Sequence, residues 1–221
     1  MSATMISLIG SLADNKCALG RRYGEWAVSA PTIESAVAAA AMAQDELGHA
    51  RSTYPVLAKL GVERSDDGPD AGHPLGVISS ELPDWASFIA ANLVVDGVLT
   101  TFVASTRDSS IEPLAQRARK ILQEEGAHKV HAGAWARRMG QVGGSDLELL
   151  VQRIDEMWAS VARWPGPDDH PGYREAMEAG MVAYGPAEIR GQVRGWLTQL
   201  VPGISLDEPT DWSDWDDQLR R

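Results

Sequence analysis

Apolar residues recur every three or four positions along four long stretches of the chain, the spacing typical of amphipathic helices. This pattern predicts helices over residues 7–28, 32–60, 83–106 and 111–140. Pro31 suits the start of the second helix, and Gly61 suits its end. The pattern therefore predicts an all-α fold with a four-helix core.

The remaining chain predicts shorter elements. Ser145 and Glu148 have the spacing of a capping box that opens a helix to about residue 163. Shorter helices are expected over 173–184 and 186–200, and residues 63–76 predict a loop because Asp, Gly and Pro are frequent there. We expect one domain over 1–221, with a core bundle at 7–140, C-terminal helices at 145–200 and an extended tail at 202–221.

Two of the apolar stripes are interrupted by a Glu and a His three positions apart. The pairs are Glu46 with His49 and Glu125 with His128. Residues i and i+3 project from one helix face, so each pair can bind one metal ion. The two stripes are Met42, Glu46, His49, Thr53 and Leu57, and Leu114, Ala118, Ile121, Glu125, His128, Ala132, Trp135 and Met139.

Two further charged residues lie where the core is expected. Asp96 is the one acid within the apolar run 90–103, on a stripe with Leu93 and Leu99. A buried Asp needs a cation or a metal, although a structural hydrogen bond is the ordinary alternative. Lys16 lies on the apolar stripe of the first helix and either extends to the surface or faces the carboxylates of the other helices.

Together these residues match most of a known ligand plan. Ferritin-like di-iron bundles use two Glu-x-x-His helices and one carboxylate from each of two more helices. One Glu-x-x-His pair alone is weak evidence for a metal site, because a lone His or Glu on an apolar stripe is usually a structural group. Two pairs on separate helices favour a shared site, because unpaired buried charges are costly.

Composition and charge limit the classes of partner. The net charge of −11 argues against nucleic acid and anionic membranes. Cys17 is the only cysteine, which excludes an internal disulfide and fits a reducing cytoplasm. We expect a cytoplasmic protein, because no signal peptide and no apolar run of membrane-spanning length is evident.

Several motifs resemble the phenylacetic acid catabolic proteins, the catalytic and structural subunits of the bacterial phenylacetyl-CoA epoxidase. The similarity covers most of residues 10–215. The motifs are Gly24-Glu25-Trp26, Ser29-Ala30-Pro31-Thr32, Gln44-Asp45-Glu46-x-x-His49, Val95-Asp96-Gly97, Glu124-Glu125-x-x-His128 and the tail from Ile204 to Trp212. The resemblance implies a ferritin-like bundle. In the family's catalytic subunit, two irons activate dioxygen to epoxidise the ring of an aromatic CoA thioester, and a reductase supplies the electrons. The family's structural subunit has the same fold but has lost metal ligands.

Carried over by motif, five of the six family ligands are present. The implied metal ligands are Glu46, His49, Asp96, Glu125 and His128. The sixth position, a carboxylate in the family, aligns with Lys16, and a protonated lysine cannot bind a metal. The three carboxylates and Lys16 sum to −2 with neutral histidines. Electrostatics therefore favours one metal, or none with protonated histidines, over a di-iron pair.

Three functions are compatible with this departure. The leading hypothesis is a non-haem iron mono-oxygenase acting on an aromatic or related acyl-CoA thioester, with one or two irons. In it Lys16 and Asp96 take part in catalysis, Lys16 as a hydrogen-bond donor. The alternative is a metal-free scaffold subunit that pairs with a catalytic homologue, with Lys16 bound to Glu46, Asp96 and Glu125. The third is a metal-binding protein with unrelated redox chemistry. A homodimer or a heteromer is expected by analogy.

Overall fold

The structure is a computed structural model that describes residues 2–62 and 72–221. In this part of the chain every regular element is helical, which confirms the all-α, ferritin-like fold. The elements are α1 (Ala3–Trp26), α2 (Ile33–Lys59), η1 (Gly76–Ile78), α3 (Trp85–Ala90), η2 (Ala91–Asp96), α4 (Gly97–Ser105), α5 (Glu112–Val142), α6 (Gly144–Val161), α7 (Pro171–Glu178) and α8 (Pro186–Leu200).

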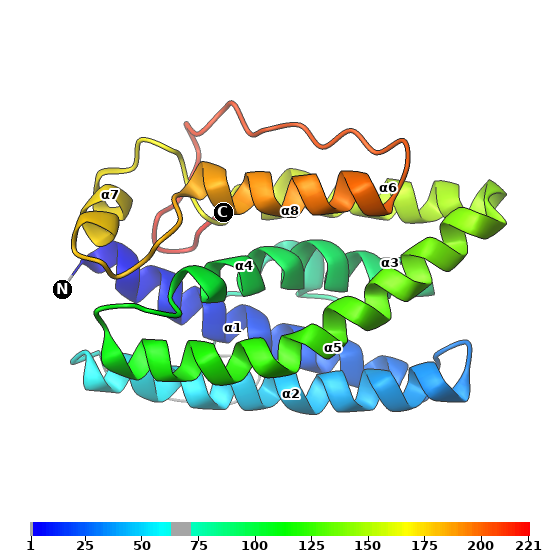
Figure 1. Ribbon diagram of the computed structural model, residues 1–221, viewed down its shortest axis with the longest axis horizontal. Helices are drawn as coiled ribbons and strands as arrows, with labels where there is room; N and C mark the ends of the chain where they lie inside the picture. The colour runs from blue at the N-terminus through cyan, green and yellow to red at the C-terminus, as the bar shows by residue number, and fades with distance from the viewer. Residues whose placement is uncertain (1, 63–71) are drawn as a thin grey trace.

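The long helices lie side by side, with α1 and α2 forming one layer of the molecule (Figure 1). These two helices pack closely because Gly20 has no side chain. A Cβ at Gly20 would lie 2.8 Å from Leu47 Cγ and 3.0 Å from the Ala43 carbonyl oxygen. Helix α5 crosses the front of the bundle in Figure 1, and α6 and α8 lie along the top, on the side opposite α1 and α2. The core lies among α1, α2, α5 and the helix formed by α3, η2 and α4.

The stretch from α3 to α4 is one helix with a π-helical middle. Ala91–Asp96 form the π segment, and Asp96 is its last residue. This helix is apolar enough and long enough to cross a membrane, but 83% of the apolar window is buried inside the molecule. Its apolar side chains therefore belong to the core of the bundle. A π segment often marks a functional position, and this one brings Asp96 into the interior.

The predicted limits of the four long helices differ from the structure by a few residues, but two shorter predictions were wrong. Ser145 does not cap α6: the helix already begins at Gly144, and its N-cap is Gly143 with φ of 67°, which glycine adopts readily. The helix expected over 173–184 begins at Pro171 and ends at Glu178, where Gly180 follows with φ of 65°. The loop prediction for 63–76 falls partly outside the described residues, and the single-domain prediction stays a prediction.

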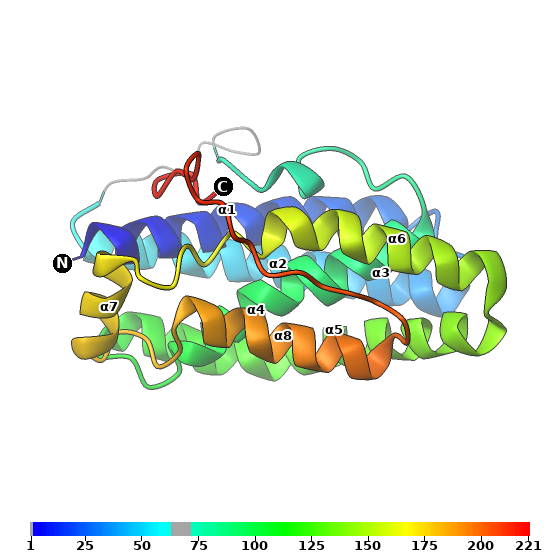
Figure 2. The same cartoon turned by 90° about the horizontal axis from the view of Figure 1, so that it is seen from above.

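The tail after α8 is extended, as expected, and runs along the bundle surface (Figure 2). Its end is fixed by Arg220, which is fully buried. The Arg220 guanidinium donates hydrogen bonds to the carbonyl oxygens of Trp164 at 2.8 Å and Pro165 at 2.6 Å. It also pairs with Asp217 at 2.9 Å. The backbone of Asp217 accepts a hydrogen bond from Ser7, so the tail end contacts α1.

Candidate functional site

Lys16 lies at the centre of a buried cluster of charges. Its side chain is fully buried, and its Nζ lies 3.1 Å from Glu46 Oε1. The same atom lies 2.5 Å from Asp96 Oδ1 and 2.5 Å from Glu125 Oε1. One ammonium with three donors thus meets three carboxylates, one from each of three other helical segments. Lys16 does not extend to the surface, which was the ordinary alternative for this residue.

His49 joins this cluster to the surface. Its Nδ1 lies 3.2 Å from Glu125 Oε1 and 3.7 Å from Glu46 Oε2. Its Nε2 lies 2.8 Å from Oε2 of Glu124, whose side chain is about one-third exposed. One ring nitrogen therefore faces the buried acids, and the other faces an acid that reaches solvent.

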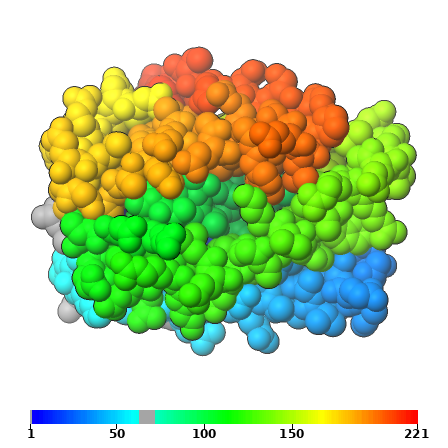
Figure 3. Space-filling model, viewed as in Figure 1, coloured from blue at the N-terminus to red at the C-terminus, as the bar shows by residue number. Residues whose placement is uncertain are grey.

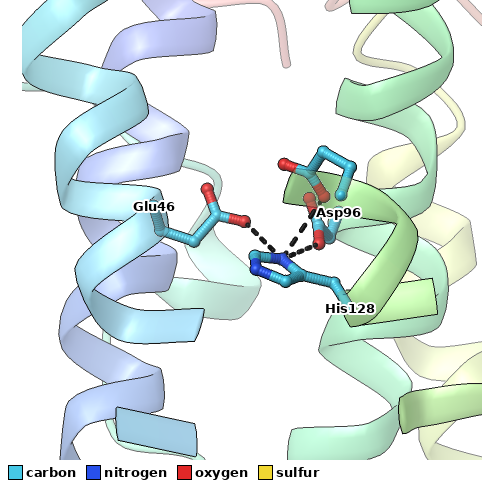
Figure 4. A group of neighbouring side chains, drawn as sticks. Glu46, Asp96 and His128 are labelled. Atoms are coloured by element: carbon cyan, nitrogen blue, oxygen red, sulfur yellow. Dashed lines mark hydrogen bonds and ion pairs between the residues drawn. The ribbon is translucent and has the colours of Figure 1, made fainter. Parts of the chain in front are cut away.

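His128 is placed in the same way from α5. Its Nδ1 lies 3.3 Å from Asp96 Oδ2, 3.3 Å from Glu125 Oε2 and 3.5 Å from Glu46 Oε1. Figure 4 shows Glu46 approaching this imidazole from α2 and Asp96 from the opposite side. The other nitrogen, Nε2, lies 3.3 Å from Oδ2 of Asp45, whose side chain is also about one-third exposed. Both histidines therefore bridge the buried acids to one outer carboxylate each.

Sequence reasoning gave no role to Asp45 and Glu124. Each directly precedes the Glu of a Glu-x-x-His pair. An acid at this position in both motifs was the sequence signal that could have identified them. A residue one position before the buried Glu points partly outward on a helix, which suits it to reach the histidine edge from the surface. Both acids line a groove of about 310 Å³ between α2 and α5, together with His49, Arg117 and Lys120.

The carboxylates are held ionised by the cations that they contact. Burial raises the pKa of Glu125, but Lys16 and the two histidines outweigh it and hold that pKa well below its usual range. The pKa of Glu46 is lowered for the same reasons. Asp96 differs, because burial and the charges of Glu125 and Glu46 raise its pKa to about 6. At neutral pH most Asp96 side chains are still ionised, and this fits the short contact with Lys16.

The bases are held protonated by the same contacts. Burial lowers the pKa of Lys16, but the carboxylates of Asp96, Glu125 and Glu46 more than offset it, so the pKa lies well above its usual value. Burial likewise lowers the pKa of His49, and hydrogen bonds to Glu125 and Glu46 raise it to about 9. Contacts with Asp96, Glu125 and Glu46 raise the pKa of His128 to about 12.

The donor set suits one cation better than two. Ligand atoms of Glu46, Asp96, Glu125 and His128 lie within 4.8 Å of one another, so they could surround a single ion. Among the described residues, however, the Lys16 ammonium already lies between three of these four groups. A di-iron centre does not fit this arrangement, because Lys16 offers no lone pair while protonated and places a positive charge beside the carboxylates.

All six residues singled out in the sequence therefore come together: Lys16, Glu46, His49, Asp96, Glu125 and His128. His131, one turn beyond His128, does not join them. It is half-buried and packs edge-on against the rings of Trp85 and Phe88. Burial and the charge of His128 lower its pKa, so it is a neutral aromatic contact at neutral pH.

Comparison with known proteins gives a consistent result. The family model described as phenylacetic acid catabolic protein matches residues 1–220. The chain is also similar to one of the subunits of the 1,2-phenylacetyl-CoA epoxidase of Escherichia coli (strain K12). The two are 26% identical over 202 residues, which cover 88% of this chain and 78% of that protein. Because the family model spans nearly the whole chain, this protein belongs to the phenylacetic acid catabolic protein family.

Proposed function

We propose that this protein is a metal-free structural subunit of an epoxidase-type complex, in which it pairs with a catalytic homologue. The observation that carries the proposal is the position of the Lys16 ammonium, 3.1 Å or less from one oxygen each of Glu46, Asp96 and Glu125. The Lys16 ammonium, a covalent part of α1, thereby takes the structural role of a metal ion. It holds acids from three other helical segments together at the centre of the bundle.

Charge balance supports this reading over the iron-dependent one. The three buried carboxylates contribute −3, and Lys16 contributes +1. Protonated His49 and His128, whose pKa values are raised to about 9 and about 12, contribute +2, so the cluster is neutral. With neutral histidines, two ferrous ions would instead leave the same cluster at +2. A neutral cluster is the arrangement that burial favours.

The similar Escherichia coli subunit supports the proposed pairing with a catalytic homologue. Its name describes one subunit of a phenylacetyl-CoA epoxidase, a protein of more than one chain. On this proposal the present chain supports a catalytic subunit, and the aromatic acyl-CoA substrate, the irons and the electrons from a reductase belong to that partner.

An iron-dependent mono-oxygenase is the second candidate. The observation that favours it is the group of four potential ligand atoms within 4.8 Å of one another. In that case the metal would be held by Glu46, Asp96, Glu125 and His128, with His49 beside them, and Lys16 would have to lose its proton or move away.

Metal analysis distinguishes the metal-free subunit from the iron-dependent mono-oxygenase. The protein is loaded anaerobically with ferrous ion, desalted and measured by elemental analysis, beside Lys16→Glu, which restores a carboxylate at this position. We expect no stoichiometric iron in the wild type and between one and two irons per chain in the variant. Circular dichroism of both proteins, with and without iron, checks that the variant folds. Two irons per wild-type chain would reject the metal-free proposal.

Co-purification tests the pairing itself. The wild-type chain is co-expressed, with a tag on one partner, with a family member that keeps a carboxylate where this chain has Lys16. We expect both chains in a fixed ratio and all iron in the partner. Failure to co-purify, with a metal-free wild type, would leave the ion cluster as proposed but reject the role as a subunit.

A further inference from the structure

Helices α2 and α5 adjoin along a seam at the surface of the molecule. Trp135 of α5 donates a hydrogen bond to Ser35 Oγ of α2 at 2.9 Å. Further along α2, His49 contacts Glu124, which lies earlier in α5, so the two helices run antiparallel. In Figure 3 the atoms of α5, in green, adjoin those of α2, in blue and cyan, along the lower part of the visible face. Toward its C-terminal end α5 rises away from α2 in Figure 1, and a hollow of about 340 Å³ lies between the two helices there.

Apolar side chains flank this hollow although they are exposed. Val37 of α2 is 64% exposed, and Val130 of α5 is 68% exposed. Val37 lies one turn from Glu34, and Val130 lies one turn from Ala134. Glu34 and Ala134 both line the hollow. Single exposed apolar residues are ordinary on a monomer, but apolar surface on two adjoining helices beside a hollow is typical of a protein interface.

The hollow also holds a tryptophan and an arginine in fixed positions. Trp135 is held by its hydrogen bond to Ser35, and the Arg138 guanidinium lies 5.0 Å from the centre of the Trp135 ring. Trp and Arg are among the residues that contribute most binding free energy at protein interfaces. Among the described residues no carboxylate, that of Glu34 included, lies at ion-pair distance from Arg138. Its charge is therefore available to a carboxylate of a partner.

The charge of α5 favours an acidic partner. This helix carries six Lys or Arg and three Glu, whereas the rest of the chain carries twice as many acids as bases. Arg117 lies at the other end of the seam, about 30 Å along α5 from Arg138. The acids of the seam at that end, Asp45 and Glu124, already contact His128 and His49. A second copy of the chain would place one cationic helix against another, so a partner with carboxylates on its face fits better.

We propose that the catalytic partner subunit docks on this seam with a helix that is apolar in its middle and acidic at both ends. Its apolar side chains would cover Val37 and Val130, one terminal carboxylate would pair with Arg138, and the other would pair with Arg117. The inference rests on the proposed function, because the partner is the catalytic homologue named there, and it adds the face and the chemistry by which the two chains pair.

Binding of purified chains tests the apolar part of the seam. The probe is a family member that keeps a carboxylate where this chain has Lys16, and biolayer interferometry at pH 7 measures its Kd for each variant. Val130→Asp would bury an unpaired carboxylate and should weaken binding by at least about 100-fold. Val37→Asp tests the opposite wall and should have the same effect. Met177→Asp, at a 40% exposed apolar position on α7, is the control and should stay within about twofold of the wild type.

Charge reversal tests the ends of the seam. Arg138→Glu should weaken binding by about tenfold or more, because it places a carboxylate against the acids of the partner. Arg119→Glu is the control on the same helix, since Arg119 pairs with Asp108 outside the seam, and it should stay within about twofold. Thermal unfolding of every variant checks that it folds.

The possible failures are distinct. Wild-type affinity in the variants at Val37, Val130 and Arg138 would place the docking face elsewhere and overturn this inference, while the proposed function would stand. No binding by the wild-type chain would reject both the role as a subunit and this inference. A wild-type homodimer in analytical ultracentrifugation, dissociated by Val130→Asp, would show that a second copy occupies the seam and would also overturn it.

Discussion

The ammonium of Lys16 lies 2.5 Å from the carboxylate of Asp96, although the two residues are 80 positions apart in the chain. The contact joins the middle of α1 to the end of the π segment. Because Asp96 also lies 3.3 Å from His128, it extends the same ion cluster to α5. The stability of the bundle should therefore depend on groups that in a metal-binding homologue would be assigned to catalysis.

Removal of the Lys16 charge should destabilise the protein severely. Lys16→Met keeps a long side chain but leaves three buried carboxylates without their ammonium. We expect the free energy of unfolding to fall by about 3–5 kcal/mol, the usual cost of breaking a buried ion pair. Urea denaturation in the presence of a chelator measures it. Lys120→Met, whose wild-type side chain is 68% exposed, is the control and should change stability by less than about 0.5 kcal/mol. Equal stability of Lys16→Met and wild type would contradict the cluster's structural role.

Stability should fall as the pH rises above neutrality. The pKa of His49 is raised from 6.5 to about 9, so the protonated ring stabilises the folded state fully below pH 6.5. That contribution, about 3 kcal/mol, is lost progressively as the pH rises to 9. His128, whose pKa is raised from 6.5 to about 12, adds a loss of its own, because its ring stays protonated in the folded state while the unfolded state loses the proton above pH 6.5. Denaturation curves from pH 6 to 9 measure the slope, and His49→Gln should make it shallower while leaving the part due to His128. A wild-type slope equal to that of the variant would show that His49 is not the group responsible.

The outer carboxylates should act on one histidine each. Glu124→Gln removes the acid that lies 2.8 Å from His49 Nε2 and should lower the pKa of His49 by about 0.5 unit, because the Glu124 side chain is partly solvated. Asp45→Asn should do the same to His128 and leave His49 unchanged. Imidazole chemical shifts followed by NMR titration report both values. If either variant shifted both histidines equally, the pairwise assignment would be wrong.

Arg220 should hold the tail in place. Arg220→Ala leaves the carbonyl groups of Trp164 and Pro165 without their donor and should cost about 2–4 kcal/mol of stability. The tail after α8 should then be cleaved faster in limited proteolysis. The adjacent Arg221→Ala is a matched control, since Arg221 is exposed and should have little effect. Cleavage of the tail at the same rate in both variants would rule out Arg220 as the anchor.

The sequence was sufficient to predict the four long helices and the six residues of the ion cluster. Charged residues at core positions are rare enough to be informative, and helical spacing places them on one face. It could not decide whether Lys16 reaches the surface or the acids, because a lysine stem allows both. That choice depends on where Asp96 and Glu125 lie in space, which is set by packing between helices remote in sequence.

Local signals were less reliable where the backbone departs from the standard pattern. The spacing of Ser145 and Glu148 suggested a cap, but two glycines with positive φ let α6 begin two residues earlier, with Gly143 as its N-cap. The π segment has no comparable local signature, because its apolar residues also fit an ordinary α-helix. Asp45 and Glu124 belong to the sequence motifs, but the sequence does not show what they contact. Their roles follow from the positions of the histidine rings in the structure.

The π segment has a consequence for how this chain can change by insertion and deletion. Each residue of an α-helix turns the chain by about 100°, so one residue gained or lost rotates the two flanking parts relative to each other. Phe88, which precedes the segment, and Asp96, which ends it, are both buried now. Deleting one residue between positions 91 and 95 would turn one of them away from the interior. The burial of Phe88 at one end and of Asp96 at the other thus depends on the number of residues between them. Only sequence changes that preserve this number keep both side chains in the interior.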